Sequence, residues 1–235
     1  MGGMPRDTLT RDQIVRAAVA LLDEEGLEGL NMRALGVRLG SAATAVYWHV
    51  GSKDNLIALA GDHVWSELPL PQAPAGRAGW RAAAEAMAVG VHGMLADHPW
   101  LVQAFGAYLT FGPGKARHDD HLLGLYEDAG FTPDEADRAS AAVLTFVLGN
   151  ALGPAAAAAL QRKLAHESGD AEARLAEGMA QAREVASQYP RLRARLDTPD
   201  AAEHGADYGS APDQTFAFGL RSLLDGLEAR LRAQR

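Results

Sequence analysis

Four side chains between residues 44 and 53 carry groups that suit contact with double-stranded DNA: Thr44, Tyr47, His49 and Lys53. Hydroxyl, imidazole and ammonium groups donate hydrogen bonds to phosphate oxygens and to base edges in the major groove. No acidic residue occurs from Arg33 to Lys53. We therefore expect a DNA-contacting element at this point of the chain.

The charge of the whole chain argues against DNA binding, because the formal net charge is −8. An acidic protein is repelled by a polyanion unless its charges are unevenly distributed. Between Asn31 and Lys53 the charged side chains are Arg33, Arg38 and Lys53, with nothing in that segment opposing them. A small basic surface on an acidic body is enough for a few phosphate contacts.

Length and composition fit one large domain or two smaller ones, since 235 residues with 48% apolar content can bury a substantial core. The absence of cysteine excludes disulfides and thiolate chemistry and fits a reducing compartment. Residues 1–9 lack the apolar segment of a secretory signal, so we expect a flexible arm there and a cytoplasmic protein. No phosphate-binding glycine loop, nucleophile elbow or zinc signature occurs, so we predict no catalytic residue, no enzyme activity and no cofactor.

One uncharged run, from Ala139 to Leu160, is long enough to cross a bilayer. Alanine and glycine dominate it, and Asn150 and Pro154 lie inside it. Such a composition inserts poorly compared with a leucine-rich span. We therefore expect a core helix and no membrane partner.

Helical periodicity recurs along the chain, and the predicted fold is all-α. Thr10 and Gln13 have the spacing of a capping box, Gly26 is a glycine stop, Asn31 is a cap, and Gly40 suits a turn with positive φ. The third helix is expected over 42–50, with Ser41 as its cap in place of Ala42.

Two short helices joined by a glycine-containing turn form a helix-turn-helix unit. We place an N-terminal three-helix DNA-binding domain at 10–56, with a linking helix over 53–66. The pattern alone also allows an ordinary three-helix core in which Tyr47 and Trp48 pack.

A proline-rich connector, Leu68 to Pro74, opens the second region of the chain, 67–235. We expect this region to be a larger helical domain for effector binding and dimerisation. Its aromatic and methionine side chains fit either a core or an apolar ligand pocket. The candidate pocket residues are Trp80, Met87, Val91, Trp100, Phe105, Tyr108, Phe111, Tyr126, Phe146 and Asn150.

Two helices of this domain are candidates for a dimer interface. One begins at Pro133 and runs towards Leu164, with a kink or break expected at Pro154. The other is the last helix of the chain, in which leucine residues recur on one side between Phe216 and Leu231. Two such helices from each subunit can pair as a four-helix bundle. Either helix can instead belong to the core. A further helix is expected over 171–188 and a mobile loop over 196–212. The candidate interface residues are Phe146, Gly149, Gly153, Phe216, Leu220, Leu223, Leu227 and Leu231.

The chain from Thr10 to Leu59 resembles the DNA-binding domain of the tetracycline-repressor (TetR) family of transcriptional regulators. The resemblance is carried by the helix-one positions Ile14 to Leu22, by Met32-Arg33-Ala34-Leu35, and by Val46-Tyr47-Trp48-His49-Val50 with the Ser52–Leu56 start of the next helix. Gly130-Phe131-Thr132 and Phe216 to Leu220 are similar to the regulatory domain of the same branch.

The resemblance implies a homodimeric repressor that binds a near-palindromic DNA operator and is released by a small-molecule effector of unknown identity. It implies phosphate contacts for Tyr47, His49 and Lys53, and a base or phosphate contact for Arg33. Ala43, Thr44 and Ala45 fall at base-reading positions, where their small size suits thymine methyl contact. Trp48 belongs to the same set of candidate DNA-binding residues, and we expect it to support this surface from beneath instead of touching the DNA.

Tetracycline repressors bind their drug as a magnesium complex through a histidine in the regulatory domain. No histidine lies between Pro99 and Arg117, where that ligand is expected. His118-Asp119-Asp120-His121 is interpreted as a solvated helix start. We therefore predict no metal site and do not expect tetracycline as the effector.

Two alternatives to a repressor that is released by an effector are an effector-free DNA-binding dimer and a helical enzyme.

Overall fold

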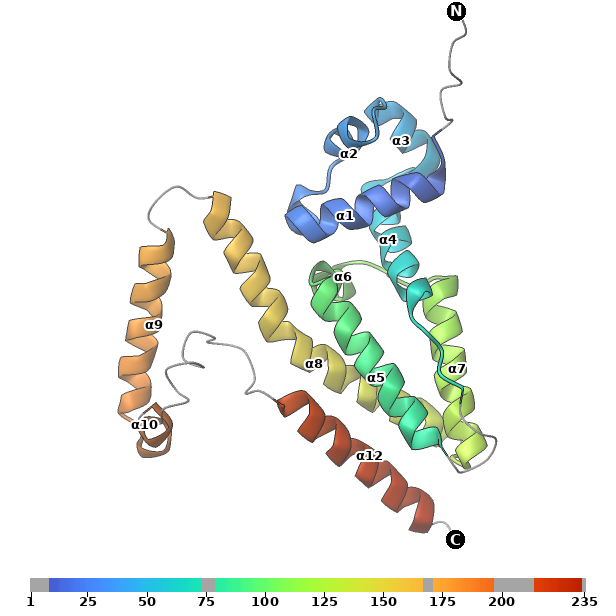
Figure 1. The fold of residues 1–235 in the computed structure, drawn as a ribbon, viewed down its shortest axis with the longest axis vertical. Helices are drawn as coiled ribbons and strands as arrows, with labels where there is room; N and C mark the ends of the chain where they lie inside the picture. The colour runs from blue at the N-terminus through green and yellow to red at the C-terminus, as the bar shows by residue number, and fades with distance from the viewer. Residues whose placement is uncertain (1–8, 73–78, 167–170, 197–213, 234–235) are drawn as a thin grey trace, which may run out of the picture.

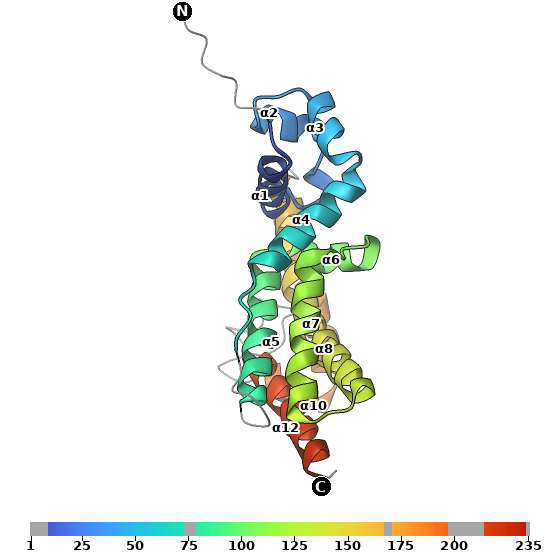
Figure 2. The same cartoon turned by 90° about the vertical axis from the view of Figure 1, so that its right-hand side faces the viewer.

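The structure is a computed structural model that describes residues 9–72, 79–166, 171–196 and 214–233. Every regular element in these ranges is a helix, which confirms the predicted all-α class. Helices α1 to α4 form one end of an elongated molecule and the remaining helices form the other (Figures 1 and 2). Most of the predicted arm at 1–9 and of the predicted loop at 196–212 lies outside the described residues.

The N-terminal unit consists of α1 (Arg11–Gly29), α2 (Met32–Arg38), α3 (Ala43–Val50) and the first turns of α4 (Lys53–Glu67). The capping box is confirmed, because Thr10 Oγ1 accepts from the Gln13 N–H at 3.2 Å and Gln13 Oε1 accepts from the Thr10 N–H at 2.9 Å. Asn31 caps α2 by accepting the Ala34 N–H at 2.8 Å. Gly26, predicted as a glycine stop, has φ 70° and a non-helical backbone, so the first helical run of α1 ends there. A second short run continues across the kink to Gly29.

The turn between α2 and α3 is held by backbone contacts. Gly40 has φ 60°, as predicted, and the Ser41 N–H donates to the Gly36 carbonyl at 2.8 Å. A Cβ added at Gly36 would lie 2.8 Å from the Ser41 carbonyl oxygen, so only glycine fits there. The predicted Ser41 cap is wrong: the N-cap of α3 is Ala42, which offers no side-chain hydrogen bond.

Helix α4 joins the two ends of the molecule (Figure 2). Ser52 caps it by accepting the Asn55 N–H at 3.0 Å. Its first turns bury Leu56 and Ile57 in the N-terminal core, and its last turns bury Val64 and Trp65 against the second domain. One rigid helix therefore contributes to both cores.

The second domain contains α5 (Trp80–Asp97), α6 (Trp100–Ala107), α7 (Pro113–Ala129), α8 (Pro133–His166) and α12 (Thr215–Ala233). Helix α7 begins at Pro113, since proline is tolerated in the first turn of a helix. Helix α8 is not interrupted at Pro154.

Helix α8 is long and apolar enough to cross a membrane, judged by length and composition over Pro133–Leu164. In the structure it packs along α5, α7 and α12 as a member of the helical domain. Helices α9 (Ala171–Ser187) and α10 (Pro190–Leu196) pack on each other and stand apart from the main body (Figure 1).

Candidate nucleic-acid interface and effector domain

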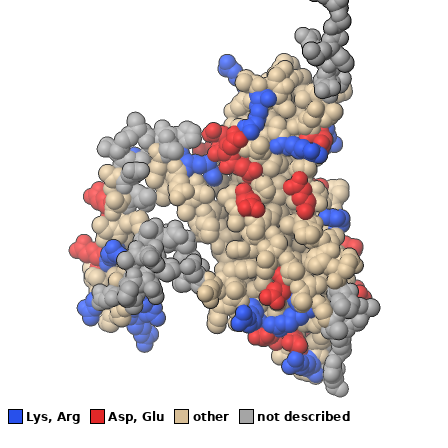
Figure 3. All heavy atoms as spheres, viewed as in Figure 1, with Lys and Arg blue, Asp and Glu red and all other residues tan. Residues whose placement is uncertain are grey.

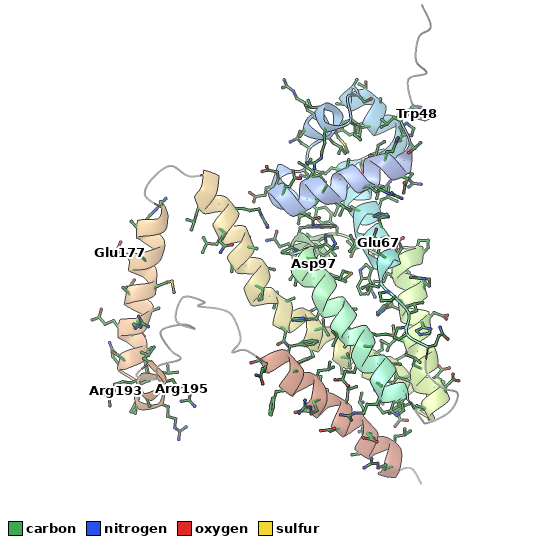
Figure 4. The ribbon with its side chains drawn as sticks, in the orientation of Figure 1. Trp48, Glu67, Asp97, Glu177, Arg193 and Arg195 are labelled. Atoms are coloured by element: carbon green, nitrogen blue, oxygen red, sulfur yellow. The ribbon has the colours of Figure 1, made fainter. Side chains whose placement is uncertain are left out.

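Helix α3 turns one face to the core and the opposite face outwards. Val46 and Val50, four residues apart, are buried. Tyr47 is 48% exposed and Trp48 83% exposed, so the alternative in which both aromatics pack inside a plain three-helix core is wrong. The expectation that Trp48 supports the surface from beneath is also wrong. Trp48 stands at the outer edge of the N-terminal unit (Figure 4).

The remaining candidate DNA contacts differ in how far they reach the surface. Thr44 is exposed and shares the outer face of α3 with Trp48, four residues on. Ala43 and Ala45 are half-buried. The His49 ring is half-buried and meets the Trp48 indole edge-on, with ring centroids 4.9 Å apart. The structure therefore brings Thr44, Tyr47, Trp48 and His49 together on one short helix.

Two cations flank this helix. Arg33 is exposed on α2 and has no ion-pair partner among the described residues. Lys53, at the start of α4, is half-buried, and its Nζ donates to the Leu27 carbonyl at 2.9 Å. Lys53 therefore ties the last turn of α1, after the kink at Gly26, to the start of α4.

Arg38 is paired with an acidic side chain, although its own segment of the sequence contains none. Its guanidinium contacts both carboxylate oxygens of Glu24 at 2.5 and 2.7 Å. The hydrogen bond from Arg38 lowers the pKa of Glu24. Glu24 lies on α1, outside the segment whose charges suggested a basic surface, so only the tertiary structure shows the pair. The outer tip of the unit carries mostly uncharged side chains, and acidic side chains gather below it (Figure 3).

A polar contact joins the N-terminal unit to the second domain. Asp23 Oδ1 accepts from Trp100 Nε1 at 2.7 Å and lies 2.7 Å from His98 Nδ1. The hydrogen bond with Asp23 raises the pKa of His98, helped by the negative charges of Asp97 and Glu67. Asp97 and Glu67 end α5 and α4 close to this junction (Figure 4). Trp100, predicted to line a pocket, is fully buried and uses its N–H in this contact.

The other predicted pocket residues differ in how far they are buried. Trp80, Met87, Val91 and Tyr126 are buried in the core of the domain, and Trp80 contacts Tyr126 with ring centroids 5.8 Å apart. Phe105, Tyr108, Phe146 and Asn150 are half-buried, and the Asn150 amide donates to the Phe146 carbonyl of its own helix at 2.8 Å. Phe111, also a candidate pocket residue, is 61% exposed in this chain.

A hollow of about 690 Å³ lies elsewhere, between the end of α1, α6 and the last part of α8. None of the predicted pocket residues lines it. Its walls are Glu25, Gly26, Leu27, Glu28, Gly29, Gln103, Ala159, Leu160, Arg162 and Lys163.

The His118–His121 segment is not a solvated helix start. Helix α7 begins at Pro113, and His118 is only 4% exposed. Lys115 is also buried, and its Nζ pairs with the Asp119 carboxylate at 2.7 and 2.8 Å. Among the described residues, no group of three or more histidine, aspartate or glutamate side chains is placed to hold a metal ion.

The side of α12 on which leucine residues recur faces its own protomer. Leu220 and Leu231 are buried within the chain, together with Leu224, which the predicted interface omitted. A Cβ at Gly219 would lie 2.4 Å from the Phe146 ring, so this glycine serves contact between α12 and α8 inside one subunit. Assigning Leu220 and Leu231 to a dimer interface is therefore wrong. Phe216, Leu223, Leu227 and Gly153 are half-buried, and Gly149 is exposed.

A different face of α8 and α12 is exposed and uncharged. On α8 it consists of Ala142, Thr145, Gly149, Leu152 and Ala156, at helical spacing. On α12 it contains Phe218, which is 76% exposed, followed by Ser222 and Gly226. Gly149 was among the predicted interface residues. The others were missed because an amphipathic pattern shows which side of a helix is apolar, and here the most apolar side packs within the protomer.

A helix-turn-helix unit with an exposed aromatic recognition helix, joined through one long helix to a larger helical domain, defines a ligand-regulated class of DNA-binding transcriptional regulators. Residues 14–60 match the family described as bacterial regulatory proteins, tetR family, and residues 70–231 match the tetracyclin repressor-like C-terminal domain. The chain therefore belongs to the tetracycline-repressor family.

Characterised proteins are similar along nearly the whole chain. The HTH-type transcriptional repressor DrrR1 of Streptomyces coeruleorubidus is 35% identical over 98% of this chain and 81% of its own length. The class A tetracycline repressor from transposon 1721 in Escherichia coli is 29% identical over 94% of this chain and 92% of its own. The crystal structure of ActR from Streptomyces coelicolor in complex with actinorhodin is 25% identical, covers 95% of this chain and 98% of ActR, and has a TM-score of 0.68.

Proposed function

We propose that this protein is a homodimeric repressor that binds a near-palindromic operator and leaves it when a small molecule binds the second domain. The observation that carries the proposal is the outward face of α3, where Thr44, Tyr47 and Trp48 are exposed on a helix anchored by Val46 and Val50. Exposed aromatic side chains that lie next to each other form an apolar patch, so Tyr47 and Trp48 on one short helix favour a binding surface.

The proposed roles on DNA follow from position and chemistry. Tyr47 and His49 donate to phosphates, and Arg33 reaches a base edge or phosphate from α2. Thr44 reads bases by its hydroxyl and methyl group, while Ala43 and Ala45 permit close approach to the groove floor. Lys53 contacts a phosphate once its bond to the Leu27 carbonyl is exchanged. Trp48, being exposed, is assigned to the DNA surface as well.

Dimerisation is proposed through the exposed uncharged face of α8 and α12. Small residues at Ala142, Gly149 and Ala156 let a partner helix approach closely, and Leu152 and Phe218 supply apolar area. Two helices from each subunit then form a four-helix bundle about a twofold axis. A twofold dimer explains why a near-palindromic operator is expected.

Release from DNA is proposed to act through α4, because this helix is buried in both domains. The effector must bind the conformation that does not fit the operator more tightly than the one that does. Because the target is chromosomal DNA, we place the protein in the cytoplasm. No catalytic step, cofactor or metal is assigned.

The DNA-binding part is tested by selecting operators from random double-stranded DNA with the full-length protein and measuring binding by fluorescence anisotropy. We expect Tyr47→Ala and Trp48→Ala to weaken operator binding by about tenfold or more, the loss of one to two good contacts. Tyr189→Ala is the matched control, since Tyr189 is an exposed tyrosine at the far side of the molecule, between α9 and α10. Unchanged affinity in both α3 variants would contradict the interface.

The effector part is tested by thermal shift and operator release with a library of small molecules that includes actinorhodin and minocycline. A compound that raises the melting temperature and also releases DNA supports the repressor. If no compound does both, the effector-free dimer is favoured.

A further inference from the structure

Unpartnered polar atoms in the core concentrate at one contact. In the described part of the chain, the buried side-chain atoms without a hydrogen-bond partner are Trp65 Nε1, both ring nitrogens of His118 and the Tyr126 hydroxyl. Trp65 and His118 touch each other in an edge-to-face arrangement, with ring centroids 4.9 Å apart. Three of these four atoms therefore belong to one pair of side chains.

Such a cluster is unusual because folding removes these groups from water without replacing their hydrogen bonds. A polar pair that is buried and unsatisfied is what a site built for a hydrogen-bonding ligand requires.

The charges around the pair are already matched. Lys115 Nζ lies 4.8 Å above the Trp65 ring, but it is also paired with Asp119. Neither charge is left for a ligand, so the site favours an uncharged group.

The hydrogen-bonding capacity of the pair defines that group further. An indole Nε1 only donates. His118 Nδ1 lies 3.6 Å from Asp119 Oδ1, which favours the proton on Nδ1 and leaves Nε2 as an acceptor. The ligand must therefore accept from one nitrogen and donate to the other, and a hydroxyl group does both. The Phe105 ring also meets Trp65 edge-on, with centroids 6.2 Å apart, so the surroundings are aromatic.

We infer that Trp65 and His118 form the polar end of the effector site, and that the effector is an uncharged hydroxylated aromatic molecule. Its hydroxyl donates to His118 Nε2 and accepts from Trp65 Nε1. This inference rests on the proposed function and adds the chemical class of the effector. Because Trp65 belongs to α4, a ligand bound here touches the helix that joins the two domains.

The test compares 2-naphthol with naphthalene as probes, by titration calorimetry on the full-length protein. The quantity measured is the ratio of the Kd for naphthalene to the Kd for 2-naphthol, in which the apolar contribution largely cancels. We expect this ratio to fall about tenfold in His118→Leu, the value of about one net hydrogen bond. His121→Gln is the matched control, because His121 lies on the same helix and bonds the Pro71 carbonyl. Its ratio should equal that of the wild type.

A second readout separates a ligand-binding histidine from a structural one. Without probe, we expect the melting temperature of His118→Leu to stay close to that of the wild type, because the lost contact of Nδ1 with Asp119 is offset by removal of the unpartnered Nε2. An unchanged Kd ratio, or a clearly lower melting temperature, would overturn the inference. Operator binding is measured on the same samples. If the wild type binds its operator but the Kd ratio is unchanged in His118→Leu, only this site is rejected. If the wild type binds no operator, the proposed function is rejected.

Discussion

The indole N–H of Trp100 donates a 2.7 Å hydrogen bond to the Asp23 carboxylate, and this bond joins α6 directly to α1. The same carboxylate oxygen lies 2.7 Å from His98 Nδ1 at the end of α5. The two domains are therefore connected by a polar contact as well as by the continuous helix α4. A movement of α6 in the second domain has to break this contact or carry α1 with it.

Removing the carboxylate should destabilise the junction. Asp23→Ala leaves the buried Trp100 N–H without an acceptor, and we expect a loss of about 1–3 kcal/mol in the free energy of unfolding, measured by urea denaturation. Asp12→Ala is the control on the same helix, because Asp12 forms only an exposed pair with Arg16. Equal stability of Asp23→Ala and wild type would show that the junction contributes nothing.

The junction should also depend on pH. Hydrogen bonding to Asp23 raises the pKa of His98 in the folded state above its ordinary value of 6.5. A raised pKa means that the stabilisation is fully present below the unfolded pKa and is lost as the pH rises through the folded pKa. We expect the free energy of unfolding to fall as the pH rises above 6.5 and through the raised pKa of His98, and less so in His98→Gln. Burial lowers the pKa of His92, an effect of opposite sign that both proteins share. Parallel pH profiles would contradict this assignment.

The exposed Arg38–Glu24 pair should limit DNA affinity. Glu24→Gln frees the guanidinium and removes a negative charge close to the helix-turn-helix unit. We expect tighter operator binding and a salt dependence steeper by up to about one phosphate contact. The measurement is anisotropy over a series of salt concentrations, with Glu127→Gln, an exposed position at the end of α7, as control. A slope identical to the wild type would place Arg38 outside the DNA surface.

The proposed dimer interface predicts a specific dissociation. Leu152→Arg places a charge in the middle of the exposed face of α8, where burial against a partner leaves it unpaired. Analytical ultracentrifugation should then show monomers at concentrations where the wild type is dimeric. Val89→Arg adds the same charge at an exposed apolar position of α5 and should leave the dimer intact. If Leu152→Arg remains dimeric, a different face is used.

Features decided by local backbone chemistry could be predicted from the sequence. The Thr10 and Asn31 caps and the positive φ of Gly40 depend on residues within one turn, and the structure shows all three. The outward direction of Trp48 and the inward direction of Leu220 depend on where the rest of the protein lies.

The wrong predictions about Arg38 and His118 have the same cause, because both depend on contacts between residues that are distant in the sequence. The pairing of Arg38 with Glu24 joins residues on different helices, and the burial of His118 depends on Trp65 from α4. The local pattern of acidic and basic residues around 118–121 is that of a solvated surface, because sequence spacing carries no information about which helix covers it.

Because the backbones of α2 and α3 approach closely at Gly36, the angle between these helices does not depend on which side chains they present to the DNA. The crossing of α2 and α3 is set by main-chain atoms of Gly36 and Ser41, without help from any outward side chain. Residues such as Arg33 and Thr44 are therefore exchangeable without tilting the helix that carries them. Substitutions at these exposed positions can therefore change the DNA sequence that is recognised, one residue at a time, while the orientation of α3 in the major groove stays the same.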